Sequence, residues 1–283
     1  MVTSIREDIE VNGLKGKTAI VTGGSSGIGQ SIAIRLAQEG MRVVINYVGR
    51  EDGARMTADA IAGDLDSCMC AIRDAGTEPI LVQADVSKED EVTAMFEEIA
   101  KQTAGVDVLI NNAGIQISAE SDALDVKDFD RVLAVNLRGS FLCAQQALRQ
   151  MASHGRGGAI VNVSSVHQEI PKPRFLGYSV SKGGMQNLTR TLALEYAGRG
   201  IRVNAVAPGA TVTPINRSWI DDPEKREMVV SHIPMGRAGT AEEMAAVTAF
   251  LCSDDAAYIT GQTIFVDGGL TLFADFRTTW SSE

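Results

Sequence analysis

The chain has 283 residues, 45% of them hydrophobic and 22% charged, which is ordinary for a folded chain with a full core. Its formal net charge is −10, and no run of Lys or Arg is long enough to follow a phosphate backbone, so nucleic acid and anionic membrane surfaces are excluded as partners. No apolar run approaches the roughly 18 residues of a membrane helix, and residues 1–17 contain no stretch of signal-peptide length, so we expect the chain in the cytoplasm.

The cysteines and histidines show no spacing that is typical of a metal site. Two of the four cysteines form a C-x-C pair rather than C-x-x-C, and the other two lie far away in the sequence. We therefore expect free thiols and no bound metal. The residues concerned are Cys68, Cys70, Cys143, Cys252, His154, His167 and His232.

Seven short apolar runs alternate with helical patterns along the whole chain. This alternation predicts an α/β fold: a single Rossmann-type domain whose doubly wound, seven-stranded parallel sheet has helices on both faces. The strand runs are apolar throughout, as burial on both faces requires. The expected strands are 18–24, 42–47, 79–85, 106–112, 158–165, 201–209 and 263–269, and the main expected helices are 28–40, 88–103, 126–152, 177–198 and 240–252.

The catalytic domain is predicted to span 14–283, after a polar and flexible arm at 1–13. Within the domain, residues 210–239 contain no strand pattern and three prolines, so we expect a long irregular segment that acts as a substrate lid.

Residues 51–78 are long for a single crossover helix, and we expect two helices there, near 52–62 and 64–75. This segment follows the second strand, on the side where an adenosine would bind. We expect it to affect the surroundings of a cofactor or the assembly of subunits rather than the chemistry.

The glycine-rich stretch "TGGSSGIG" (22–29) lies where the first strand gives way to the first helix. Glycine allows positive φ angles and close approach of a backbone N–H to a phosphate, and the helix N-terminus adds unpaired amides and partial positive charge. The alternative to phosphate binding is that these glycines only form a tight turn between the strand and the helix. The position predicts a dinucleotide site, whose contacts would be Gly23, Ser25, Ser26, Gly27, Ile28 and Gly29.

The end of the second strand should meet the adenine ribose, where an Asp or Glu would repel a 2′-phosphate. Asn46 and Tyr47 occupy this place instead, with Arg50 just beyond, which favours NADP and leaves NAD open. Arg50 is equally explained as a solvated surface charge. Asp85 and Val86 close the third strand and are expected to reach the adenine, although Asp85 is also explained as a helix cap.

Several motifs occur in one order that resembles the short-chain dehydrogenase/reductase family over about residues 14–270. They are "TGGSSGIG" (22–29), "NNAG" (111–114), Asn136 in "VNLRG", Ser165 in "NVSS", "YSVSK" (178–182) and "PGATVTP" (208–214). The resemblance implies an NAD(P)-dependent oxidoreductase that acts on CH–OH groups.

Tyr178 and Lys182 are four residues apart, so on a helix they lie side by side. A cation stabilises a phenolate, and we therefore expect two positive charges, that of Lys182 and that of an oxidised nicotinamide, to lower the pKa of Tyr178 until it exchanges protons near neutral pH. Alone, such a spacing is usually a surface pair. The resemblance implies that Ser165 binds the same substrate oxygen, that Lys182 also binds the nicotinamide ribose, and that Asn136 holds a water beside Lys182.

The resemblance also implies cofactor contacts after two further strands. The loop after the fourth strand would pass beneath the adenosine and its ribose, and the loop after the sixth would hold the nicotinamide carboxamide. The residues are Asn111, Asn112, Ala113 and Gly114 for the first loop, and Pro208, Gly209, Thr211 and Thr213 for the second. For Thr213, a turn residue before a proline is the plain alternative.

Within the family, "VSSVHQEIPKP", "SKGGM", "TPIN" and "IPMG" are similar to glucose 1-dehydrogenases, which implies a small-molecule sugar or alcohol substrate. Carried over by position, Ser165, His167, Gln116 and Asn216 are the substrate candidates, with loop packing as the plain alternative for His167. A reductase of a 3-oxoacyl thioester, ketone or keto sugar remains open, as does, remotely, a cofactor-binding scaffold without turnover. The resemblance further implies a homotetramer in which helices 126–152 and 177–198 pair, and the aromatic tail 273–280 suits a subunit contact.

Overall fold

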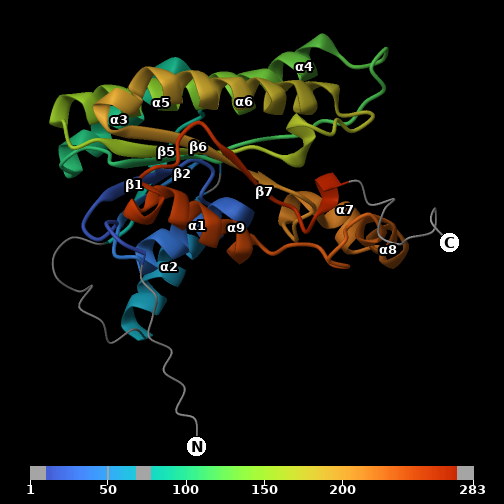
Figure 1. Ribbon diagram of the computed structural model, residues 1–283, viewed down its shortest axis with the longest axis horizontal. Coiled ribbons are helices and arrows are strands. Elements are labelled where there is room, and N and C mark those ends of the chain that lie inside the picture. The colour runs from blue at the N-terminus through green and yellow to red at the C-terminus, as the bar shows by residue number, and fades with distance from the viewer. Residues whose placement is uncertain (1–10, 50, 68–77, 273–283) are drawn as a thin grey trace, which may run out of the picture.

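The computed structural model describes residues 11–49, 51–67 and 78–272. Within these residues, seven strands form one sheet in the order β3-β2-β1-β4-β5-β6-β7, and every neighbouring pair is parallel (Figure 1). The sheet confirms the predicted fold class. Its strands are β1 (Thr18–Val21), β2 (Arg42–Tyr47), β3 (Ile80–Gln83), β4 (Val108–Asn111), β5 (Gly158–Val163), β6 (Ile201–Pro208) and β7 (Thr263–Val266).

Helices cover both faces of the sheet, with α1, α2 and α9 on one side and α3, α5 and α6 on the other (Figure 1). Their bounds are α1 (Gly27–Gln38), α2 (Asp52–Ser67), α3 (Glu89–Gln102), α4 (Val126–Leu133), α5 (Gly139–His154), α6 (Leu176–Tyr196), α7 (Arg217–Ile220), α8 (Pro223–Ser231) and α9 (Ala241–Cys252).

Each strand contributes side chains to two separate cores, as β2 shows. Val43 and Ile45 belong to the core under α1 and α9, whereas Val44 between them belongs to the core under α3 and α5. Successive side chains of a strand point to opposite faces, so a strand buried on both sides must be apolar at every position. This requirement explains why the strand runs of the sequence lack alternation.

Three predictions about helices need correction. A single helix, α2, runs from Asp52 to Ser67 through the break expected near residue 63, and residues 68–77 lie outside the described part of the chain. The expected helix 126–152 divides into α4 and α5 around a π-helical turn, Ala134–Arg138. The segment expected to be irregular, 210–239, contains the short helices α7 and α8.

The strand order places the ligand-binding edge of the sheet. The chain winds outward from β1 to β3 and then returns beside β1 with β4, so loops after β1 and β4 separate at the carboxyl ends of these strands. In open parallel sheets, ligands bind at such a switch point. Among the described residues, no helix is both long and apolar enough to cross a membrane.

Candidate active site

The glycine turn after β1 is shaped for close approach of a ligand. Gly23 and Gly27 have φ angles of 62° and 55°, a region that favours glycine. A Cβ on Gly29 would lie 2.3 Å from Nδ2 of Asn112 and 2.4 Å from the carbonyl oxygen of Gly23. Ser26 caps α1 without a side-chain hydrogen bond to its amides, so the first-turn N–H groups stay available to an anion. These features fit the pyrophosphate of a dinucleotide.

The loop after β4 is fastened to the glycine turn by hydrogen bonds. The Thr22 hydroxyl accepts from the backbone N–H groups of Asn112 (2.9 Å) and Ala113 (3.0 Å). The Asn112 amide donates to the carbonyl oxygens of Thr22 (2.9 Å) and Gly23 (3.1 Å). The side-chain amide of Asn112, a residue predicted to contact the cofactor, therefore joins the two loops. The backbone of Ala113 and Gly114 remains available to line the site.

Asn46 and Tyr47 do not present their side chains as the ribose prediction requires. Asn46 is buried, accepts from the Gly23 amide (3.3 Å) and donates to the carbonyl oxygens of Val82 (3.4 Å) and Ala84 (3.0 Å). Tyr47 is buried in the core under α1. The Asn46 side chain thus supports the glycine turn, and the Tyr47 side chain fills the core. Arg50 lies outside the described residues.

Asp85 and Val86 also serve the fold. Asp85 Oδ1 accepts from the backbone (2.9 Å) and the hydroxyl (2.7 Å) of Ser87, at the entry to α3. Burial raises the pKa of Asp85, but the hydrogen bonds from Ser87 and the nearby Lys88 outweigh burial and hold this pKa below its usual value. Asp85 therefore stabilises the turn before α3, although it does not cap the helix, whose N-cap residue is Lys88. Val86 is buried in the core under α3 and α5.

Ser165, Tyr178 and Lys182 come together at the carboxyl end of β5. Tyr178 and Lys182 lie on the first turns of α6, with Lys182 Nζ 5.5 Å from the centroid of the Tyr178 ring. Ser165 forms a side-chain hydrogen bond with Tyr178. Lys182 is buried and donates to the carbonyl oxygen of Val163 at 2.7 Å. The sequence prediction that these three groups share one site matches this geometry.

The direction of the Tyr178 pKa differs from the prediction. Burial raises the pKa of Tyr178, and the hydrogen bond with Ser165 only partly opposes this rise. Burial lowers the pKa of Lys182 to about 8. Lys182 therefore stays mostly protonated at neutral pH, but in the chain without cofactor burial still dominates the pKa of Tyr178. The phenol needs further positive charge or hydrogen bonds to ionise.

Asn136 is fully buried in the π-helical turn between α4 and α5. Its side chain accepts from the Ile115 amide (2.8 Å) and donates to the Ile115 carbonyl (2.9 Å) and to the Ser181 hydroxyl (3.1 Å). The Ser181 hydroxyl donates to the carbonyl oxygen of Tyr178 at 2.7 Å. Asn136 therefore connects the loop after β4 to the catalytic turn of α6. The sequence analysis missed Ser181, although it lies within "YSVSK".

His167 lies beside the catalytic tyrosine. Its ring meets that of Tyr178 edge-on, with centroids 6.1 Å apart, and its Nδ1 bonds to the carbonyl oxygen of Ile170 at 2.9 Å. A carbonyl only accepts, so Nδ1 carries the proton and Nε2 is left as an acceptor in the neutral ring. Burial lowers the pKa of His167, with a further contribution from Lys172, which favours this neutral form.

The remaining substrate candidates differ in position. Gln116 is partly buried and directly follows Ile115, which Asn136 holds in place. Asn216 donates its side-chain amide to the Thr211 carbonyl (2.8 Å) and the Thr213 hydroxyl (3.3 Å). The Asn216 amide nitrogen therefore stabilises the loop after β6 by hydrogen bonds within that loop.

The loop after β6 closes over the glycine turn. A Cβ on Gly27 would lie 3.5 Å from Thr213, so this loop and the glycine turn face each other. Gly209 has no room for a side chain, since its Cβ would lie 2.8 Å from Cα of Asp267. Thr211 and Thr213 are buried, and Pro208 ends β6. The four residues predicted to hold a carboxamide thus form one wall above the turn.

The lid, residues 210–239, is anchored at its base and little buried at its tip. Thr211 pairs with Gly239 in an isolated bridge. Arg237 donates to both carboxylate oxygens of Glu243 (2.9 and 2.6 Å) at the start of α9. Neither α7 nor α8 contains a buried residue. Within the described residues, no group of His, Cys, Asp and Glu side chains is arranged to hold a metal ion.

Comparison with known sequences identifies relatives along most of the chain. The pattern of the family described as "Enoyl-(Acyl carrier protein) reductase" matches residues 23–271. The chain is 49% identical over 267 residues to a glucose 1-dehydrogenase of Gluconobacter oxydans, covering 94% of this chain and 96% of that one. It is 47% identical over 264 residues to 3beta-hydroxysteroid dehydrogenase 1 of Eggerthella lenta, covering 93% and 97%.

A solved structure shares the fold. The gluconate 5-dehydrogenase of Burkholderia cenocepacia, in complex with NADP and tartrate, superposes with a TM-score of 0.82 at 34% identity. The match covers 91% of this chain and 96% of the other.

Proposed function

The chain belongs to the short-chain dehydrogenase/reductase family and is an NAD(P)-dependent oxidoreductase of hydroxyl groups, and we propose that its substrate is a sugar or a related polyol. The observation that supports this reaction most directly is the cluster of Ser165, Tyr178 and Lys182 at the carboxyl edge of the sheet, beside the glycine turn. A phenol, a hydroxyl and an ammonium in this arrangement can bind one oxygen atom and move its proton.

We propose the following roles for the side chains. Tyr178 accepts the proton of the substrate hydroxyl during oxidation and returns it during reduction. Ser165 holds the same oxygen by a hydrogen bond, and Lys182 keeps an ammonium within reach of the phenol. Asn136 fixes the turn that carries Tyr178 through Ser181. A nicotinamide cofactor, when bound, takes up or supplies the hydride.

We propose that residues of the glycine turn and of the loops after β4 and β6 hold this cofactor, and that NADP is preferred over NAD. No acidic side chain stands at the end of β2, where it would repel a 2′-phosphate. The gluconate 5-dehydrogenase that shares the fold was solved with NADP. Direct comparison of the dissociation constants of NADP and NAD tests this preference.

The sugar proposal rests on His167 and on the relatives. The free Nε2 of His167 is an acceptor next to Tyr178, which suits a second hydroxyl of the substrate. The glucose 1-dehydrogenase relative is 49% identical over nearly the whole chain. We further propose that the lid closes over this substrate, since its base is held while its tip buries no side chain.

A carbonyl reductase is the second candidate, because the same side chains serve the reverse reaction and the matching family is described as a reductase. A screen of both directions distinguishes the two. Reduced-nicotinamide absorbance would be followed with NAD and NADP over aldoses, polyols, hydroxysteroids, ketones and 3-oxoacyl thioesters. Preferred oxidation of an aldose supports the sugar proposal. Preferred reduction of a thioester or ketone refutes it, and no turnover with any of them refutes catalysis and leaves the scaffold alternative.

We propose a homotetramer whose subunits pair through α5 and α6. Phe141 on α5 and Val180 and Leu194 on α6 are exposed in the single chain, which supports contact between subunits. The tail 273–280, expected at a contact, lies outside the described residues. Light scattering at micromolar concentration tests the assembly. The cytoplasm is the proposed compartment, since Cys143 and Cys252 are buried free thiols.

A further inference from the structure

A second cavity lies at the edge of the sheet opposite to the active site. It has a volume of about 570 Å³ and is lined by the first residues of strands, among them Thr18, Arg42, Val108 and Gly158. The catalytic residues follow the carboxyl ends of the same strands. This cavity is therefore separate from the active site, and its volume suits a small molecule.

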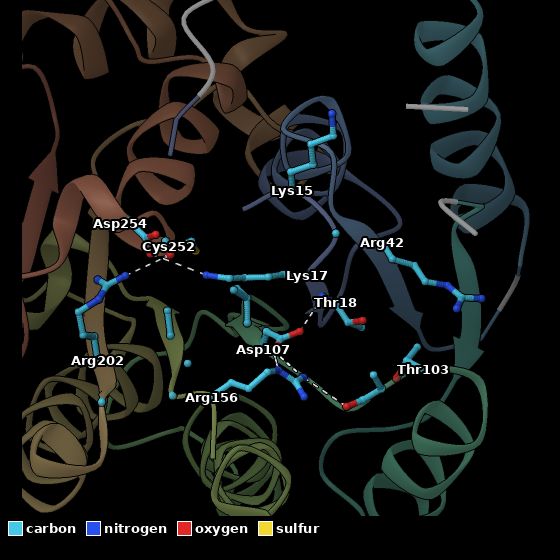
Figure 2. Close-up of a pocket in the computed structure, with 17 residues that line it drawn as sticks. Lys15, Lys17, Thr18, Arg42, Thr103, Asp107, Arg156, Arg202, Cys252 and Asp254 are labelled. Carbon is cyan, nitrogen blue, oxygen red and sulfur yellow. Dashed lines mark hydrogen bonds and ion pairs between the residues drawn. The ribbon is translucent and has the colours of Figure 1, made fainter. Parts of the chain in front are cut away.

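The lining of this cavity is strongly basic in a chain of net charge −10. It contains five cationic side chains and two carboxylates, which leaves an excess of three positive charges. Figure 2 shows Lys17 pointing toward Asp254 and Arg156 beside Asp107, while Lys15 points away from the other residues. The cationic residues are Lys15, Lys17, Arg42, Arg156 and Arg202, and the acidic ones are Asp107 and Asp254.

Two of the five cationic side chains, those of Arg202 and Arg156, stabilise the fold. Arg202 donates to the carbonyl oxygens of Leu251 (2.7 Å), Cys252 (3.1 Å) and Ser253 (2.9 Å), and so caps the C-terminus of α9. Arg156 donates to Asp107 Oδ1 through Nη2 (2.8 Å) and Nε (3.2 Å). Helix C-termini attract cations, which explains Arg202, and the ion pair with Asp107 gives Arg156 a role in the fold.

Arg42 and Lys17 are not explained in this way. Arg42 donates from Nη1 to the Gln102 carbonyl at 2.7 Å, but its Nε is buried and, in the described part of the chain, has no hydrogen-bond partner. A buried donor without an acceptor costs about 1–3 kcal/mol, which an anionic oxygen would remove. Within residues 11–49, 51–67 and 78–272, Lys17 Nζ has only a 3.7 Å ion pair with Asp254, whose side chain is exposed.

We propose that this cavity binds a small polyvalent anion, a molecule with at least two anionic oxygens of the phosphate or carboxylate type. Arg42 and Lys17 supply donors, and Arg156, which Asp107 already orients, lines the same cavity (Figure 2). Guanidinium groups held in place lose little entropy when a ligand binds. The ligand joins the starts of β1 and β2 to the ends of α3 and α5, and by binding the folded state it stabilises the protein.

Calorimetric titration with pyrophosphate and with citrate, at constant ionic strength in sodium chloride, tests this site and identifies which oxygen chemistry it takes. With the glycine turn saturated by NADP, we expect one anion bound per chain, and affinity about tenfold weaker in Lys17→Gln and in Arg42→Gln, since each removes a charged contact. Arg149→Gln, a change at an exposed arginine of α5 outside the cavity lining, should leave the affinity unchanged.

The titration also separates this cavity from the glycine turn, which is itself suited to pyrophosphate. The affinity for NADP should be equal in all three variants and the parent. If Arg42→Gln does not fold, Lys17→Gln still tests the proposal. Among the described residues Lys17 makes only the long ion pair with Asp254, so its loss should not prevent folding. Anion binding that both cavity variants retain, or the absence of binding by either anion at millimolar concentration, overturns the proposal.

Discussion

Lys182 Nζ donates a 2.7 Å hydrogen bond to the carbonyl oxygen of Val163 and lies 5.5 Å from the centroid of the Tyr178 ring. The end of β5 thus holds the ammonium next to the phenol. Burial lowers the pKa of Lys182 and raises that of Tyr178, so it disfavours the charged form of both groups. Such opposed shifts are typical of catalytic sites.

Tyr178→Phe removes the proton carrier and keeps the ring. We expect kcat to fall by about 10²–10⁴-fold, the usual contribution of a general acid–base, while the dissociation constant of NADP changes little. Steady-state kinetics and fluorescence titration measure the two quantities. Tyr258→Phe, at a fully exposed tyrosine, is the control and should retain activity. Retained turnover in Tyr178→Phe would refute the assigned role.

Lys182→Met should abolish most turnover but change stability in a pH-dependent manner. In the folded state Lys182 has a pKa of about 8, against an ordinary value of 10.5, so below pH 8 the folded chain carries the full cost of a buried charge. The free energy of unfolding of the parent should therefore rise, relative to the variant, as the pH rises from about 8 to 10.5. The total change should be on the order of 3 kcal/mol.

Urea unfolding of the parent and of Lys182→Met at several pH values measures this difference. Lys101→Met, at an exposed lysine of α3, is the matched control and should show no comparable pH dependence. A constant difference between the parent and Lys182→Met across this range would mean that Lys182 is not perturbed in the folded protein.

Gly29→Ala should damage the glycine turn. The added Cβ would lie 2.3 Å from Asn112 Nδ2, so the loop after β4 must move. We expect a loss of about 1–3 kcal/mol in the free energy of unfolding, together with weaker cofactor binding. Gly63→Ala in α2 is the control, because its Cβ meets no atom within 4 Å, and it should stabilise the chain by roughly 0.5–1 kcal/mol. Equal effects of the two substitutions would contradict the close packing of the turn.

Arg50→Ala tests the cofactor preference. If Arg50 binds the 2′-phosphate, its loss should weaken NADP by about tenfold and leave NAD unchanged. Fluorescence titration with both cofactors measures this ratio. Equal losses for both cofactors would show that Arg50 does not distinguish them.

His167→Phe tests the contact with a second substrate hydroxyl. The change removes the Nε2 acceptor and keeps a ring beside Tyr178, so we expect a higher KM for an aldose with a smaller change in kcat. His167→Gln, which restores an acceptor, should recover part of the affinity. An alcohol with a single hydroxyl should not distinguish the parent from either variant. The same KM for the aldose in all three proteins would remove His167 from the substrate site.

The sheet was predictable because its strands are buried on both faces, which requires the uninterrupted apolar runs seen in the sequence. The proximity of Tyr178 and Lys182 was predictable from a spacing of four residues on a helix. Both signals are local in the sequence, so neither requires knowledge of which distant segments come into contact.

The differences between prediction and structure concern features that depend on such contacts. Asn46 follows Val44 on the same face of β2, and there its side chain bonds to the glycine turn and β3, while its contact with a ribose stays a prediction. The pKa of Tyr178 depends on burial, which the sequence does not give. The break expected in α2 is absent, because Gly63 lies in open space where a helix tolerates it.

The unburied tip of the lid has an evolutionary consequence. Residues 217–231 form α7 and α8 without placing a side chain in either core, while the bridge between Thr211 and Gly239 keeps the ends of the segment together. Mutations there can accumulate at little cost to folding, since stability resides in the sheet. If residues 210–239 close over the substrate as proposed, exchange of this segment alone would give a lineage a new substrate while Ser165, Tyr178 and Lys182 stay in place.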